Sequence, residues 1–428
     1  MVFILSFSFI NSGCKQETTP EETETVEVAE TEEEEEVSEA QEEEEEVTIT
    51  WWVGSWKVEA GIAQQAIEEF EKEYPNINVE VTPVPWEGMY EKYLSALMAK
   101  KGGPDIITYG CQWGQEFAAS GGLADLSDLW AEVSSSVFES THEWNEFEGK
   151  QYGIPFRIET WCLYYNKTMF EKAGLNNPPK TWAQVAEYAK KITTEDVYGL
   201  GEPLDKSLQT SLNFRPVIYS FGGDFISADQ TKATFNTEEA KNAIRYYYDL
   251  FVTNKVLPPD SLSWNTDAVT QAFAAGTVGM NFDGPWGQGP YNDAGLDYGV
   301  AMIPGIDENT PGYWEIMGLS YSIPMASENK DAAYEFIKFL LRPEIDSYVS
   351  FTLPAVKEAA NLPKYQEDQI SQIFFEQFNY PIPMIKLTKS AAIYEAVAFG
   401  LQRVILGDDL ETVANEVNDE IQVLIDES

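Results

Sequence analysis

The chain has 428 residues, 43% of them hydrophobic and 13% aromatic, which is enough for two lobes with sizeable cores rather than one. Its three Cys are too few for a disulfide framework. A formal net charge of −45 repels nucleic acid phosphates and anionic membrane surfaces, so we expect no nucleic-acid partner and favour a neutral, cationic or protein partner.

The chain begins with an apolar run over residues 1–10, MVFILSFSFI, which is far shorter than the about 20 residues that a membrane-spanning helix needs. Such a run is typical of the apolar part of a secretion signal. Ser12-Gly13-Cys14 then resembles the lipobox of bacterial lipoproteins, which implies a signal peptide over residues 1–14 and lipidation of Cys14. Because no Lys or Arg precedes the run and Asn11 is polar, an ordinary leader with a chance cysteine remains the alternative.

An acidic segment follows. Seventeen Glu and one Lys give residues 15–46 a net charge of −16, and residues 1–14 have no charged side chain, so the remaining −29 belongs to residues 47–428. The segment has few large apolar residues to bury, and its like charges extend it, so we predict a disordered tether. A flexible coil of this length would span roughly 30 Å. A lipid anchor with such a tether would hold the protein at a membrane, outside the cytoplasm.

From Val47 the pattern changes to alternating strands and helices. Strands are predicted in VTITWWVGSW, INVEVTPVPW and DIITYG, and between them lie two helices, the first of which ends at Pro75. This alternation predicts parallel strands with helices on both faces. Because ligands bind at the carboxyl ends of such strands, we expect Ser55-Trp56, Trp86-Glu87 and residues 109–113 to form one rim.

The same pattern of strands and helices resumes after residue 150, which predicts a second α/β lobe. Two short strands flank Arg157 in QYGIPFRIETWCLYYNKTMF, and further strands are predicted in GMNFDGPWG, YGVAMIPG and GLSYSIP. Helices are predicted in TWAQVAEYAKKIT, with Thr181 as its N-cap, in FNTEEAKNAIRYYYDLF, with Thr237 as its N-cap, and in NKDAAYEFIKFLL.

Several of these segments together carry a family resemblance. GGPDIITYGCQWGQEFAASGGLADL, YGIPFRIETWCLYYNKTMFEKAGL, PPKTWAQVAEYAKKIT, AFAAGTVGMNFDGPW, YGVAMIPG and SENKDAAYEFIKFLLRPE resemble, in this order, the extracellular solute-binding proteins of ABC transporters. The subgroup is the one that includes maltose-binding protein and other carbohydrate binders. The resemblance runs from about Val47 to the C-terminus.

This resemblance implies an α/β, two-lobed fold of the periplasmic-binding-protein type II, which closes on its ligand like a hinged clamp. It also implies discontinuous lobes, with three interlobe crossings near Phe156, Tyr321 and Pro354. The N-terminal lobe would comprise residues 47–155 and 320–353, and the C-terminal lobe residues 158–318 and 355–428.

A carbohydrate site needs aromatic platforms for the apolar faces of sugar rings and polar side chains that discriminate among hydroxyl groups. Many of the 12 Trp lie at predicted strand ends and turns, namely Trp56, Trp86, Trp113, Trp161, Trp286 and Trp314. Any one of these could instead pack within a lobe. As a set at rim positions they favour ligand stacking.

The ligand-binding positions of the family match residues of this chain to different degrees. Trp286, in Asp283-Gly284-Pro285-Trp286, matches the stacking tryptophan best, and Glu159 matches a ligand carboxylate beside the first crossing. The resemblance implies further ligand contacts of weaker match at Ser55, Trp56, Tyr109, Gln112, Trp113, Trp161 and Tyr394. Ser55 and Trp56 match in location only, and Gln112 replaces an acid. Asp283 either contacts ligand or holds its turn.

Other reactive residues have plainer interpretations. We expect Cys111 and Cys162 to be buried free thiols, although a bridge between them is not excluded by the sequence. Arg157 could bind a sugar acid, but a salt bridge across the hinge is favoured. His142 lies in a polar loop, ESTHEWNEFEG, and is expected to be solvated.

We therefore expect a monomeric receptor that delivers a carbohydrate, such as an oligosaccharide or glycoside, to an ABC permease, without a metal or other cofactor. No nucleophile elbow, metal-ligand spacing or phosphate loop indicates an enzyme. Two alternatives remain, which are a transport receptor for polyamines or peptides and a surface glycosidase or adhesin. A carboxylate pair for glycoside cleavage cannot be singled out among the 72 acidic residues.

Overall fold

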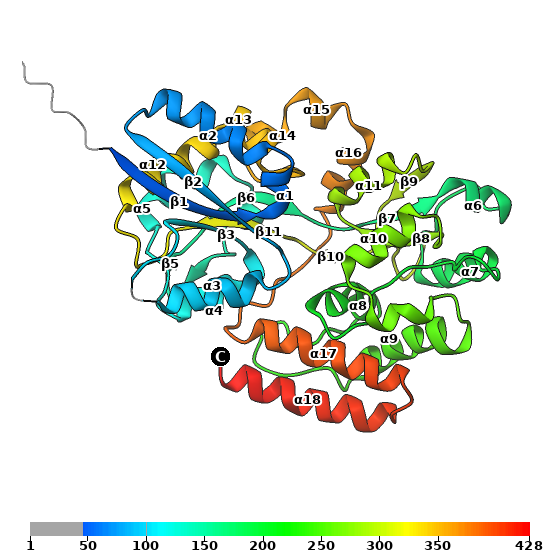
Figure 1. Ribbon diagram of the computed structural model, residues 1–428. Helices are drawn as coiled ribbons and strands as arrows, with labels where there is room; N and C mark the ends of the chain where they lie inside the picture. The colour runs from blue at the N-terminus through cyan, green and yellow to red at the C-terminus, as the bar shows by residue number, and fades with distance from the viewer. Residues whose placement is uncertain (1–45, 100) are drawn as a thin grey trace, which may run out of the picture. The chain divides into compact units, whose positions relative to one another are not determined.

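The structure is a computed structural model that describes residues 46–99 and 101–428 (Figure 1). These described residues form one compact unit. The predicted signal peptide, Cys14 and nearly all of the predicted tether lie outside the described residues. In the part of the chain that is described, no helix combines the length and apolar character needed to cross a membrane.

The larger sheet has six strands in the order β12-β6-β11-β3-β1-β2. They span Leu353–Pro354, Ile154–Glu159, Met317–Ser322, Ile106–Gly110, Val47–Gly54 and Ile77–Val84. Strand β1 pairs in parallel with β2 and β3, as the alternating pattern predicts. The alternating pattern did not indicate that the sheet is mixed, with β11 antiparallel to both β3 and β6, and β12 antiparallel to β6. These strands return from distant segments, whose direction local alternation does not determine.

The core of the larger sheet follows from the period of two in β1. Ile49, Trp51 and Val53 are fully buried on one face, and they pack against helix α2 (Ile62–Glu73). Residues of α2 at helical spacing complete this core, namely Ala63, Ala66, Ile67 and Phe70. The remaining helices near this sheet are α1 (Ser55–Glu59), α3 (Met89–Met98), α4 (Gly114–Ala119), α5 (Ser127–Val133), α12 (Lys330–Leu340), α13 (Pro343–Val349) and α14 (Lys357–Ala360).

The second sheet has three strands in the order β8-β7-β9. They span Met280–Asp283, Cys162–Asn166 and Tyr298–Ala301, and both pairings are antiparallel. The repeated α/β pattern predicted a second lobe but did not indicate this antiparallel pairing. In this part of the described chain, parallel pairing occurs between β10 (Trp314–Glu315) and β13 (Pro381–Ile382) and as single bridges, including Tyr198 with Val278 and Gly201 with Asn281. Two residues separate β6 from β7, so the chain passes directly from one sheet to the other.

Helices surround the second sheet and supply most of its core (Figure 1). They are α6 (Lys167–Lys172), α7 (Trp182–Ile192), α8 (Leu208–Ser220), α9 (Glu238–Tyr248), α10 (Thr266–Ala274), α11 (Gln288–Asp293), α15 (Pro363–Gln366), α16 (Gln369–Gln377), α17 (Ser390–Ile405) and α18 (Leu410–Asp426). Two short two-stranded sheets complete the fold, β10 (Trp314–Glu315) with β13 (Pro381–Ile382) and β4 (Glu146–Phe147) with β5 (Lys150–Gln151).

Both predicted N-caps are confirmed. The hydroxyl of Thr181 accepts a hydrogen bond from the backbone N–H of Gln184 at 3.1 Å, and that of Thr237 accepts one from Ala240 at 3.4 Å. Each cap satisfies a backbone donor that the first turn of a helix leaves free, which is typically worth about 1 kcal/mol.

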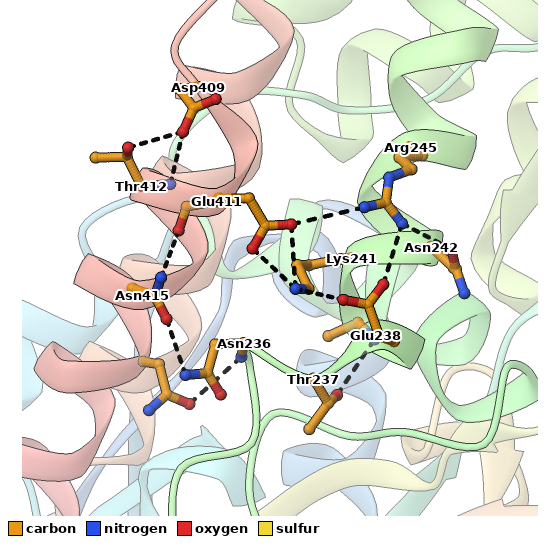
Figure 2. A network of polar contacts seen from close by, with 12 residues as sticks. Asn236, Thr237, Glu238, Lys241, Asn242, Arg245, Asp409, Glu411, Thr412 and Asn415 are labelled. Atoms are coloured by element: carbon orange, nitrogen blue, oxygen red, sulfur yellow. Dashed lines mark hydrogen bonds and ion pairs between the residues drawn. The ribbon is translucent and has the colours of Figure 1, made fainter.

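A polar network joins α9 to the C-terminal helix α18 (Figure 2). Lys241 lies at its centre, with its ammonium 2.5 Å from Glu238 and 2.9 Å from Glu411. Asn236 adds a hydrogen bond to Asn415 at 3.0 Å. The two carboxylates are more than half exposed, so the network contributes more to the register of the two helices than to stability.

The buried carboxyl of Glu202 makes stability depend on pH. Its Oε2 accepts a hydrogen bond from Asn213 at 2.7 Å, while Oε1 has no partner among the described residues. Burial raises the pKa of Glu202 from its ordinary value of 4.5 to about 8, and the bond from Asn213 opposes this shift only in part. The folded protein therefore holds a proton that the unfolded chain loses above pH 4.5.

We expect Glu202→Gln to stabilise the protein increasingly as the pH rises from about 4.5 to 8. In this window the wild type loses about 1.4 kcal/mol of unfolding free energy per pH unit, and at most about 5 kcal/mol in total, whereas the amide cannot ionise. Below pH 4.5 the two proteins should differ little. Urea unfolding at pH 5, 6, 7 and 8 measures this, with the exposed Glu367→Gln as control. A difference that does not change with pH would contradict a protonated Glu202.

Candidate functional site

Aromatic side chains gather at the carboxyl ends of the parallel strands β1, β2 and β3. The ring of Trp86 lies 6.2 Å from that of Trp56 and stacks on Trp113 at 4.9 Å, measured between ring centroids. The ring of Tyr90 lies 5.7 Å from that of Trp113. Trp113 is nearly buried, whereas 46% of Trp86 is exposed. The three loops thus meet at one rim as predicted, and we call these four residues the rim cluster.

A second aromatic group lies where the chain passes from β6 to β7 and where β8 ends. Trp161 contacts Trp286 edge to face at 5.1 Å and stacks on Trp314 at 5.6 Å. Trp161 and Trp314 are buried, whereas Trp286 is half-buried and presents part of its ring to solvent. We call these three residues the crossing cluster.

Glycine shapes both clusters in the same way. Trp56 and Trp286 each follow a glycine by two residues, and each indole folds back over the backbone of that glycine. A Cβ on Gly54 or Gly284 would overlap the ring. The φ angles, −53° and −84°, are accessible to any residue, so the glycines are needed for the close approach of the ring rather than for the turn.

We therefore expect Gly284→Ala to displace Trp286 and weaken ligand binding by about 10-fold, with little loss of stability. Gly289→Ala is the matched control, because a Cβ at that nearby position would meet no atom within 4 Å. Calorimetric titration of both variants with the ligand measures the two dissociation constants. If Gly284→Ala and Gly289→Ala bound the ligand equally tightly, the position of the Trp286 ring would not matter to binding.

Charged side chains lie beside the crossing cluster. The guanidinium of Arg157 stands over the ring of Trp286, with Cζ 5.5 Å from its centroid, and forms an ion pair with Glu159. Both residues belong to β6, so the predicted salt bridge exists but runs along one strand instead of across a hinge. Burial raises the pKa of Glu159 and lowers that of Arg157, and the ion pair opposes both shifts.

Four further predicted site residues lie next to the two clusters. Tyr109 is fully buried and donates a hydrogen bond to Asn145 at 2.9 Å. Gln112 is nearly buried, and its backbone carbonyl accepts a bond from Ser390 at 3.2 Å, which links it to α17. Ser55 is half-buried at the first turn of α1, next to Trp56.

Asp283 is the fourth, and the structure supports its role in the turn. Its carboxylate accepts hydrogen bonds from the backbone N–H of Gly284 and the hydroxyl of Thr270, both at 2.8 Å, and from the hydroxyl of Tyr291. Burial raises its pKa to about 6 despite these bonds. The fully buried side chain thereby holds Trp286 at the end of β8.

Tyr394 of α17 belongs to a buried polar network rather than to an open surface. Its hydroxyl lies 2.6 Å from Oε2 of Glu315, which also accepts a bond from Arg215 at 2.6 Å. Asp224 binds the other edge of the guanidinium through two bonds of 2.8 and 2.9 Å. Glu315 follows Trp314 on β10, so this network helps to hold Trp314, and with it the crossing cluster, in place.

Two side chains at the site, Tyr90 and Arg215, were not among the predicted ligand contacts. Tyr90 lies in the first turn of α3, just after Trp86 in the chain, and its contact with Trp113 could have been inferred from that position. Arg215 carried no such signal, because Asp224 lies beyond the end of α8, Glu315 is distant in sequence, and both meet the guanidinium only in the folded chain.

The remaining sequence predictions have mixed outcomes. Cys111 and Cys162 are both buried and free, as expected. The expectation that His142 is solvated is wrong, because the side chain is half-buried with its ring edge-on to Trp130 at 5.0 Å. Across residues 46–99 and 101–428, no group of three or more His, Cys, Asp or Glu is arranged to hold a metal ion.

Comparison with known proteins agrees with this geometry. The model of the bacterial extracellular solute-binding protein family matches residues 55–346. A maltotriose-binding protein of Pyrococcus abyssi (strain GE5 / Orsay) is 24% identical over 377 residues, which cover 85% of this chain and 79% of the relative. The sn-glycerol-3-phosphate-binding periplasmic protein UgpB of Rhizobium meliloti (strain 1021) is 26% identical, with 73% and 78% covered.

A solved structure shows the same fold. An ABC transporter solute-binding protein of Thermotoga lettingae TMO, bound with α-D-tagatose, superposes with a TM-score of 0.82 at 28% identity, covering 88% of this chain and 99% of the other. The fold is thus the two-lobed type II fold of periplasmic binding proteins. The chain belongs to the bacterial extracellular solute-binding protein family, whose members are receptors for solutes outside the cytoplasm.

Proposed function

We propose that this protein is the substrate-binding component of an ABC transporter and that it captures a carbohydrate for delivery to a membrane permease. One observation carries the proposal: the protein has two tryptophan clusters, and each includes a partly exposed ring. These rings are Trp86 in the rim cluster and Trp286 in the crossing cluster. Partly exposed indoles offer large, rigid, apolar faces, which suit the C–H faces of sugar rings. The relatives that bind maltotriose and tagatose support the same class of ligand.

In this proposal the residues have distinct roles. Trp286 stacks on one sugar ring, with Trp161 and Trp314 behind it, and Trp56, Trp86 and Trp113 provide a second platform. Glu159, Gln112 and Ser55 supply polar groups that discriminate among hydroxyls. Tyr109, Asp283 and Tyr394 do not contact the sugar but hold the loops that carry the aromatic rings.

We also propose the lobe boundaries, the contact with the permease and the attachment to the membrane. The larger sheet with its helices would form the N-terminal lobe and the second sheet the C-terminal lobe, with the boundaries predicted above. Closure of the two lobes around the sugar would create the surface that the permease recognises. The monomeric protein would be held at the membrane by a lipid on Cys14 and by the acidic segment that follows.

A thermal-shift screen tests the ligand class. The full chain, produced as Cys14→Ser to prevent lipidation, is tested against mono- and oligosaccharides, polyamines and peptides. A ligand that binds only the folded state stabilises it by about 2.7 kcal/mol at 100 times its Kd. Stabilisation by one class of saccharide supports the proposal. Stabilisation by polyamines or peptides alone would overturn the carbohydrate and keep the transport role.

A cationic ligand is the second candidate, because carboxylates surround part of the rim cluster. Burial and neighbouring Glu91 and Glu116 raise the pKa of Glu395 on α17. Burial and a hydrogen bond to Glu116 likewise raise the pKa of the Tyr90 hydroxyl. A polyamine would lower the repulsion among these carboxylates, and the screen distinguishes it from a sugar.

A further inference from the structure

Arg157 is buried, and its guanidinium donates no hydrogen bond to any residue that the structure describes. Only 5% of the residue is exposed, and its contact with Glu159 goes through Nε, without the geometry of a good hydrogen bond. Arg215 shows the usual situation, because Asp224, Glu315 and Tyr394 together bind three of its nitrogens. An arginine has five N–H donors in a planar fork, so Arg157 has donors to spare.

Other donors near Arg157 are also without partners. The hydroxyl of Thr160 and the indole N–H of Trp161 are buried, and neither has a hydrogen bond within the described part of the chain. Both residues follow Glu159 directly, and Trp161 contacts Trp286, over which the Arg157 guanidinium lies. Folded proteins leave few such groups unsatisfied, and each costs about 1–3 kcal/mol. This corner of the site therefore favours a group rich in acceptor oxygens.

We propose that Arg157 makes the site selective for carbohydrates that carry an anionic substituent, a carboxylate or a phosphate, beside the ring that stacks on Trp286. The inference rests on the proposed function. A carboxylate or phosphate matches the planar fork of arginine and accepts two parallel hydrogen bonds from it, and lysine cannot reproduce that geometry. Glu159 contacts the Nε side, which leaves the two terminal nitrogens for the ligand.

The overall acidity of the protein does not contradict this selectivity. The net charge of −29 on residues 47–428 acts at long range, where salt screens it within about 8–10 Å. The guanidinium acts at contact distance in a buried setting, where screening is weak. The charge of the whole molecule therefore affects the rate of association more than the preference for an anionic group.

Calorimetric titration of matched ligand pairs tests the inference on the full Cys14→Ser chain. The pairs are glucuronate and glucose, galacturonate and galactose, digalacturonate and its dimethyl ester, and maltose 1-phosphate and maltose. We expect the charged member of at least one pair to bind about 10- to 100-fold more tightly. The uronate and phosphate arms distinguish the two sources of negative charge.

Variants then separate recognition from a structural role. Arg157→Gln should weaken binding of the charged member about 10-fold more than binding of its neutral partner, and Arg157→Lys should restore part of this difference. Arg342→Gln is the matched control, because this exposed arginine makes a bidentate pair with Glu73, both bonds at 2.6 Å, away from the clusters. It should leave every ratio unchanged.

Two results overturn the inference alone. One is that the neutral member binds as well as or better than the charged one in every pair that binds. The other is that Arg157→Gln weakens both members equally, as loss of a structural ion pair would. If no saccharide binds in these titrations or in the thermal-shift screen, the proposed function fails and the inference with it.

Discussion

Replacing Trp286 by alanine is expected to lower the affinity for the transported sugar by about 30- to 1,000-fold. The indole is the exposed face of the crossing cluster, with Trp161 packed edge-on against it and Arg157 over it. Truncation to Cβ removes the platform and leaves Trp161 and Arg157 open to water. The effect should exceed that of Trp86→Ala, because Trp86 is 46% exposed and packs at the edge of its cluster, against Trp113 and Trp56.

Calorimetric titration with the sugar found in the thermal-shift screen measures this loss. Trp286→Phe should recover part of the affinity, because a smaller aromatic ring still offers an apolar face. Trp130→Phe serves as control, since Trp130 packs against His142 and belongs to neither cluster. If Trp286→Ala bound the sugar as tightly as the wild type, the proposed placement of the site would be wrong.

Replacing Glu315 by alanine is expected to destabilise the protein by about 3–5 kcal/mol. Glu315 is 1% exposed, and its carboxylate binds both Arg215 and the hydroxyl of Tyr394. Its loss would leave part of a buried guanidinium and a buried hydroxyl without an acceptor, and Asp224 would remain as the partner of Arg215 on the other edge. Leaving such groups unpaired is what makes the loss of one member of a buried pair costly.

Urea unfolding at pH 7 measures the change. The triple variant Arg215→Met, Asp224→Asn, Glu315→Leu should be less destabilised than Glu315→Ala, because it removes the guanidinium together with both of its carboxylate partners. The exposed Glu73, which pairs with Arg342, offers the control Glu73→Ala, for which we expect little change. A Glu315→Ala protein as stable as the wild type would mean that the network makes no net contribution.

The rim of the site could be predicted from the sequence because its residues obey a local rule. Each of the strands β1, β2 and β3 ends where an apolar run meets a turn, and parallel neighbours bring their carboxyl ends to one edge. Trp56, Trp86 and Trp113 therefore had to meet. The two threonine N-caps were predictable for the same reason, since a cap depends only on the four residues of the first turn.

The direction of the later strands could not be predicted in this way. Strands β11 and β12 join the larger sheet after long excursions of the chain, and their antiparallel pairing depends on which end of the sheet the returning segment reaches. The alternating pattern of strands and helices is the same for either direction. The antiparallel second sheet was missed for the same reason.

The order of the motifs along the chain indicated a two-lobed α/β receptor through their resemblance to a known family, and the hydrophobic period placed tryptophans at strand ends, because both features are local. Which polar residues face the ligand and which support the loops depends on the folded structure. Tyr394 bonds to Arg215 and Glu315, which are distant from it in sequence. Asp283 accepts bonds from Gly284 and Thr270 that hold its turn. Arg157, by contrast, stands over Trp286 with donors to spare. A side chain's role depends on whether its partners are satisfied inside the fold, and those partners are chosen by packing in three dimensions.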